Sequence, residues 1–165
     1  MTTKSFRGMM QEDEVDVIPL STNTGKIGYR ITKMQIMPVD VGGAVNTANE
    51  ATVQIYSIKT SADSQAALTN ANIDFSDNTL LGVAYFTRDQ GVVAINSETI
   101  IFDNTKFNQD VFIVYKDSQT NNVGFNYYIE METSMLSSDE NTVDTLKDIR
   151  NIEANNLIQW VNNII

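Results

Sequence analysis

The sequence predicts a mainly β fold, an antiparallel, jelly-roll-like β-sandwich followed by a C-terminal helix and tail. Short apolar stretches with two-residue alternation are separated by turn-forming residues. These stretches all precede the one helical pattern, which argues against βαβ units and a parallel sheet. Asn, Thr, Ser and Gln make up much of the remainder, and they suit strands and turns better than long solvent-facing helices.

The length of 165 residues suits one domain, which we divide into three segments. Residues 1–14 are polar and aperiodic, so we expect either a mobile N-terminal arm, of the kind that often orders only against a neighbouring subunit, or an edge segment. Residues 15–136 hold the strand patterns and are expected to form the sandwich. Residues 137–165 are expected to form a helical tail.

The first two predicted strands cover residues 15–20 and 27–38. In the second strand the apolar set changes phase between Ile31 and Met34. A shift of one residue inside a strand predicts a β-bulge, here near Thr32–Lys33.

Further strands follow at the spacing expected of sandwiches and jelly rolls. The stretch 111–115 is apolar on both faces, which predicts a central strand. The stretch 125–131 shows the clearest alternation, whereas residues 73–78 carry turn chemistry. The expected strands of this part of the chain cover 52–57, 80–87, 92–95, 99–102, 111–115 and 125–131.

A helix is predicted after Leu136, because Ser137 or Ser138 can cap it and an apolar stripe with a spacing of three follows. The last nine residues carry a large apolar load that includes the single Trp of the chain. They are expected either to fold back over the sandwich or to dock on a neighbouring subunit. The predicted subunit-docking residues are Leu157, Trp160, Val161, Ile164 and Ile165.

The chain contains neither His nor Cys, which excludes Ser-His-Asp and Cys-His catalysis and the common zinc sites. We therefore predict a protein that is not an enzyme and has no cofactor. Glu130 and Glu132 lie two residues apart on one strand face, near the carboxylate separation of inverting glycosidases. A solvated polar face explains the same alternation and is the favoured interpretation.

Two oxygen-rich loops contain the calcium candidates Asp74, Asp77 and Asp103. The first loop lacks the Gly and the terminal Glu of an EF-hand loop. Asp and Asn are also common turn formers, so the same residues are expected in a metal-free turn.

The formal net charge of −10 argues against nucleic acid as a partner, because phosphate binding needs clustered Lys and Arg. The sequence has no stretch of about 18 consecutive apolar residues, so no transmembrane helix is expected. The N-terminus has no apolar segment after its positive charges, so no signal peptide is expected.

The stretches 126–132 and 145–151, with Thr142 between them, resemble a group of poorly characterised virion structural proteins of marine tailed bacteriophages. The stretch 74–82 is similar to them as well, and the resemblance extends from Gly28 to Asn151. It implies a component of the virion and carries over no functional residues.

The expectation from sequence is therefore a non-enzymatic virion structural protein, either a capsid decoration or cement protein or a minor capsid protein. It is expected to form a homo-oligomer and to contact the major capsid protein or other virion proteins. One alternative is a phage tail or connector component. The other is a carbohydrate-binding β-sandwich in which Tyr29, Tyr56, Tyr85 and Tyr128 stack on sugars.

Overall fold

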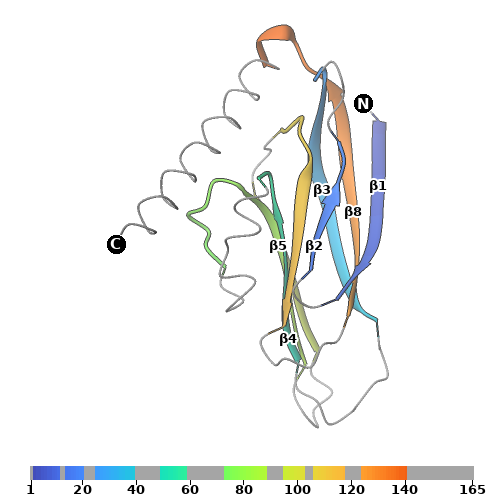
Figure 1. Ribbon diagram of the computed structural model, residues 1–165, viewed down its shortest axis with the longest axis vertical. Helices are drawn as coiled ribbons and strands as arrows, with labels where there is room; N and C mark the ends of the chain where they lie inside the picture. Colours follow the sequence, from blue (N-terminus) through green and yellow to red (C-terminus); the bar gives the residue numbers. More distant parts are fainter. Residues whose placement is uncertain are drawn as a thin grey trace.

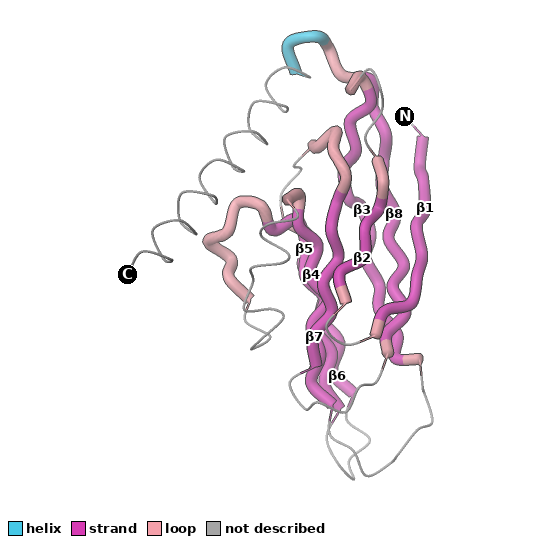
Figure 2. The backbone as a smooth tube through the Cα atoms, viewed as in Figure 1, coloured by secondary structure: helices cyan, strands magenta, loops and turns pink. Residues whose placement is uncertain are grey.

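Two antiparallel sheets pack face to face in this computed structural model, which confirms the predicted sandwich (Figures 1 and 2). The structure describes residues 2–11, 14–20, 25–39, 49–58, 73–88, 95–102, 106–117 and 124–140. One sheet has three strands in the order β1-β8-β3, and the other has five in the order β2-β7-β4-β5-β6. The strands are β1 (Thr2–Met10), β2 (Val15–Ile18), β3 (Ile27–Pro38), β4 (Asn49–Tyr56), β5 (Leu80–Arg88), β6 (Ile95–Ile101), β7 (Val111–Asp117) and β8 (Phe125–Met135).

The strand pairing follows the jelly-roll pattern, in which eight strands fold like one long hairpin wound into two sheets. The first strand pairs with the last, β2 pairs with β7, and β4 pairs with β5. The remaining jelly-roll pair is modified, because β6 pairs with β5 and only contacts β3. The fold is therefore jelly-roll-like, with one strand added to the larger sheet.

The core lies between the sheets and is built on the inward side of β8. Phe125, Tyr127, Ile129 and Met131 are buried, while the residues between them point outward. Phe125 meets two aromatic rings of the opposite sheet, Phe86 at 5.3 Å and Tyr115 at 5.2 Å between ring centroids. The alternation that predicted this strand thus reflects one face in the core and one face toward solvent.

The predicted β-bulge is confirmed, since the register of β3 against β8 shifts between Ile31 and Lys33. The extra residue, Thr32, donates a 3.2 Å hydrogen bond from its hydroxyl to the carbonyl oxygen of Glu130. The bulge keeps Ile31 and Met34 in the core despite their odd spacing. It also returns Lys33 to the solvent-facing side.

The central position predicted for residues 111–115 is confirmed, because β7 lies between β2 and β4 and is buried on both faces. On the side of this sheet away from the main core, Tyr56, Leu80 and Val114 form a second buried cluster. A chain of polar side chains runs along β4 on the same side. The Tyr56 hydroxyl donates to Gln54 Oε1 at 2.5 Å, and Gln54 Nε2 donates to Thr52 Oγ1 at 3.4 Å.

Two expectations for strands were wrong. The mobile arm predicted for residues 1–14 is a nine-residue strand over Thr2–Met10, as the alternative of an edge segment implied. The separate strands predicted at 92–95 and 99–102 are replaced by one strand, β6, and Val92–Ala94 lie outside the described residues. Both errors concern edge strands, whose many exposed positions weaken the apolar alternation.

The predicted helix start is confirmed at Ser137. Its hydroxyl accepts a 3.2 Å hydrogen bond from the Glu140 amide, and the Glu140 carboxylate accepts a 2.9 Å bond from the Ser137 amide. The hydrogen bonds that the Ser137 amide and hydroxyl donate to the Glu140 carboxylate lower its pKa, and the charge of Lys106 acts in the same direction. Residues 141–165 lie outside the described residues. Nothing in the described ranges forms a helix with the length and hydrophobicity that a membrane crossing requires.

Gly8 allows β1 to lie close to Tyr127, and this contact yields a prediction. A Cβ atom at Gly8 would approach the Tyr127 hydroxyl oxygen to 2.6 Å, and that hydroxyl already donates a 2.5 Å bond to Asp16. Gly8→Ala is therefore expected to lower the free energy of unfolding by about 1–3 kcal/mol, because the ring must shift in a packed interior.

Urea unfolding followed by circular dichroism will measure the effect. Thr3→Ala is the matched control on the same strand, since Thr3 is exposed, and it is expected to stay within about 0.5 kcal/mol of the parent. Equal stability of the parent and Gly8→Ala would show that Tyr127 moves freely.

Candidate interaction surface

The outward face of the three-stranded sheet is the surface that the fold displays most fully. The registers of β1 and β3 against β8 arrange its side chains in four rows that cross all three strands. From one end of the sheet to the other, the rows are Thr3–Glu132–Arg30, Ser5–Glu130–Lys33, Arg7–Tyr128–Gln35 and Met9–Asn126–Met37.

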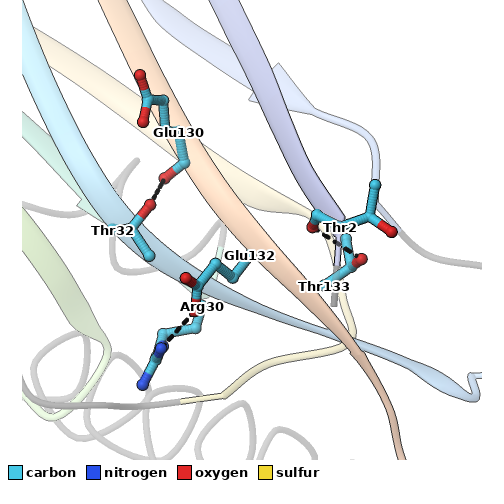
Figure 3. A network of polar contacts seen from close by, with 6 residues as sticks. All are labelled: Thr2, Arg30, Thr32, Glu130, Glu132 and Thr133. Carbon is cyan, nitrogen blue, oxygen red and sulfur yellow. Dashed lines mark hydrogen bonds and ion pairs between the residues drawn. The ribbon is translucent and has the colours of Figure 1, made fainter.

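The first two rows are neutralised by ion pairs between β8 and β3. Arg30 pairs with Glu132 (Figure 3). Lys33 Nζ lies 3.7 Å from a carboxylate oxygen of Glu130. These side chains are roughly a third to a half exposed, so each pair contributes only about 0–1 kcal/mol. The solvated-face interpretation of the two glutamates thus gains a physical basis, because each carboxylate balances a cation of the neighbouring strand.

Tyr128 connects the neutralised rows to the next one. Its hydroxyl donates to a Glu130 carboxylate oxygen at 2.8 Å, and Lys33 Nζ lies 5.7 Å from the centroid of its ring. The hydrogen bond to Glu130, with burial and the negative charge of that carboxylate, raises the pKa of Tyr128. The Ser5 hydroxyl acts in the opposite direction. Tyr128 therefore stays neutral and directed toward the ion-paired half of the face.

The last two rows carry no carboxylate, and we call them the Arg7 surface (Arg7, Tyr128, Gln35, Met9, Asn126 and Met37). Arg7 is exposed and forms no ion pair with any other described residue. Met9 and Met37 are 54% and 59% exposed. A hollow of about 600 Å³ opens here, lined by Arg7, Gly8, Gln35, Ile36, Met37, Asn126, Tyr127 and Tyr128.

The Arg7 surface adjoins the outer edge of β1, which pairs with β8 on its other side and forms the right-hand margin of the molecule in Figure 1. Each of the other three sheet edges in the described part of the chain is either shorter than β1 or bridged by another residue. The edge of β3 is bridged by Phe107, which exchanges hydrogen bonds of 2.7 and 3.0 Å with Tyr29. The strand β2 has four residues, and the edge strand β6 has seven. The nine-residue β1 is thus the longest unbridged edge among the described strands.

The sequence did not point to this surface. Arg7 and Met9 fall within the segment for which a mobile arm was predicted, and Met37 and Asn126 had no assigned role. A usable signal was present in residues 6–10, where Phe6, Gly8 and Met10 alternate with the two outward residues. This pattern is short, and its inward glycine concealed it.

Two of the calcium candidates have turn-forming roles. Asp74 Oδ1 accepts hydrogen bonds from the Ser76 amide at 2.8 Å and the Ser76 hydroxyl at 2.6 Å, and these bonds lower the pKa of Asp74. Asp77 Oδ1 accepts the equivalent pair from Thr79, at 2.8 and 2.6 Å. Asp103 lies outside the described residues. Within the described ranges, no group of three or more acidic, His or Cys side chains is placed to hold a metal ion.

The four tyrosines considered for sugar stacking do not form a common platform. Tyr29 and Tyr56 are buried, at 3% and 0% exposure, so their faces are closed to a ligand. Tyr85 lies on the five-stranded sheet and donates a 2.8 Å hydrogen bond to Glu50, whereas Tyr128 lies on the other sheet.

The predicted docking residues all lie outside the described residues, so their role stays a prediction. They are Leu157, Trp160, Val161, Ile164 and Ile165.

Comparison with known proteins adds no relative. No protein-family model matches the chain, and no curated protein matches it either.

Proposed function

We propose that this chain is a non-enzymatic structural component of a virion, a capsid decoration or cement protein or a minor capsid protein that stabilises the shell through subunit contacts. The observation that carries the proposal is the long open edge of β1 beside the carboxylate-free Arg7 surface. An open edge is a ready site for pairing with another chain, and soluble monomers usually cover or interrupt such edges.

The fold and the resemblance described above support the same proposal. Jelly rolls are common in viral capsid domains, although lectins and cupins use them too, so the fold alone does not give the function. The similarity to phage virion proteins favours the viral use. The proposed partners are the major capsid protein or other virion proteins together with further copies of this chain, and the proposed location is the virion.

The ionic and polar groups of the described residues fit an assembly role. Glu130 and Glu132 are engaged by cations, and Asp74 and Asp77 are engaged by turns. In the absence of His and Cys, the side chains most often used as general bases and nucleophiles near neutral pH are missing. The exposed groups of the Arg7 surface, Arg7 and two methionines, are of the kind that protein interfaces favour.

Light scattering on the purified chain tests the proposal, with the full chain compared with a variant that ends at residue 156. We expect an oligomer for the full chain and a smaller species after removal of residues 157–165, because an apolar terminal segment with Trp is a typical subunit anchor. Mass spectrometry of purified virus particles from the source of the gene is the second measurement. A strict monomer in both forms, together with absence from the particle fraction, would contradict the proposal.

A further inference from the structure

We propose that the open edge of β1 accepts an extended acidic strand from a partner protein, which extends the three-stranded sheet and places carboxylates against Lys4 and Arg7. This inference rests on the proposed assembly role and specifies the chemistry of one contact. It concerns strand addition, a mode in which main-chain hydrogen bonds supply affinity and alternate side chains supply specificity.

The backbone of β1 is suited to pairing on its second side. All nine of its residues pair with β8 in one unbroken register, from Thr2 with Thr133 to Met10 with Phe125. The strand contains no proline and has no bulge, the devices that commonly block or twist an edge. Thr2, Thr3, Lys4 and Ser5 are all exposed, so this half of the edge is accessible to another strand.

Charge identifies the incoming strand as acidic. The strand β1 carries two cations and no carboxylate, whereas the whole chain has a formal net charge of −10. Lys4 stands in the row of Met131 on the inward side, with its Nζ 5.6 Å from the centroid of the Tyr29 ring. Arg7 stands in the row of Tyr128 on the outward side. A paired strand with carboxylates three residues apart presents one to each cation, because successive side chains alternate between faces.

The same charges disfavour a second copy of β1 as the occupant. Two cationic strands side by side place like charges on neighbouring positions, which destabilises strand pairs. On the outward side, a long side chain of the added strand reaches past Arg7 toward the hollow, where Gln35 and Asn126 supply amides. The two exposed methionines of that surface are flexible enough to fit apolar side chains of varied shape.

The test uses the full chain and the synthetic peptide Thr-Val-Glu-Thr-Val-Glu-Thr-Val-Thr, with blocked ends. Matched peptides carry Gln or Lys in place of both Glu residues. We expect amide hydrogen exchange in β1 to slow about tenfold at a peptide concentration ten times the Kd, because exchange then requires release of the peptide. At low salt, the Gln peptide is expected to bind about fivefold more weakly, since two favourable cross-strand charge pairs are lost.

Charge reversal on the protein separates strand addition from nonspecific attraction. The double variant Lys4→Glu/Arg7→Glu is expected to prefer the Lys peptide, while Lys106→Glu, a control outside the sheet, retains the preference of the parent. An N-methylated Glu peptide, which lacks alternate amide donors, is expected not to protect β1. Equal binding of all peptides, protection outside β1, or self-association that the charge reversal abolishes would each overturn the inference. If this inference fails, the proposed function is still tested separately, by oligomerisation through residues 157–165 and by the presence of the chain in virus particles.

Discussion

Phe125→Ala is expected to lower the free energy of unfolding by about 3–5 kcal/mol, the typical cost of removing a large aromatic side chain from a core. Phe125 is 1% exposed and lies on β8 in the smaller sheet. Its ring contacts Phe86 and Tyr115 of the larger sheet at interplanar angles of 68° and 46°. The truncation therefore removes aromatic contacts that join the two layers and leaves a cavity between them.

Chemical unfolding monitored by circular dichroism will measure this loss, with two variants for comparison. Phe125→Leu is expected to recover part of it, because most of the apolar volume is retained. Met135→Ala, at a position on the same strand that is 76% exposed, is expected to change stability by less than about 0.5 kcal/mol. A cost for Phe125→Ala as small as that for Met135→Ala would mean that the two sheets do not pack as described.

Alkaline pH is expected to destabilise the protein strongly. Burial is the main cause that raises the pKa of both Tyr56 and Tyr127 above the usual value near 10, and nearby aspartates add to it. The folded state thus keeps both protons at pH values where the unfolded state has released them. Stability from these groups is complete below about pH 10 and falls above it by up to about 1.4 kcal/mol per pH unit for each tyrosine.

Urea unfolding at a series of pH values up to 12 will show the slope. The chain has no His or Cys, the side chains that ordinarily titrate near neutrality, so we expect a nearly constant stability from about pH 6 to 9. Tyr56→Phe/Tyr127→Phe is expected to be less stable at neutral pH, because Gln54 and Asp16 lose hydrogen-bond donors. The loss of stability per pH unit above about pH 10 is nevertheless expected to be smaller for this variant. An equal loss in the parent and the variant would refute the assignment of the alkaline destabilisation to Tyr56 and Tyr127.

The elements that were predicted correctly are those whose buried positions can be recognised from their own sequence. The alternation in β8 and the phase change at Thr32 both reflect a single buried face, so the sequence pattern was sufficient. The capping pair of Ser137 and Glu140 is local, with partners three residues apart. The strand pattern of β7 was sufficient as well, because both of its faces are buried.

The first strand was not predicted, because its own alternation is short and its order depends largely on a distant partner. Residues Thr2–Met10 lack a strong pattern of their own and become a strand through pairing with Phe125–Thr133. The interaction surface was missed for the same reason. The placement of Glu130 and Glu132 on the face of β8 away from the core was correct from sequence. Their cations come from β3, and only the register of the sheet places Arg30 and Lys33 beside them.

The pairing of the first strand with the last also affects how the chain folds. The Thr133 hydroxyl donates a hydrogen bond to the Thr2 carbonyl oxygen, 131 positions away in the sequence. Contacts between residues so far apart in the sequence slow folding, to a timescale of milliseconds to seconds. At about 5–20 residues per second on the ribosome, β1 waits on the order of ten seconds for β8 to be made. A strand that waits so long without a partner risks aggregation. The polar start of β1, Thr2–Ser5, reduces that risk during synthesis.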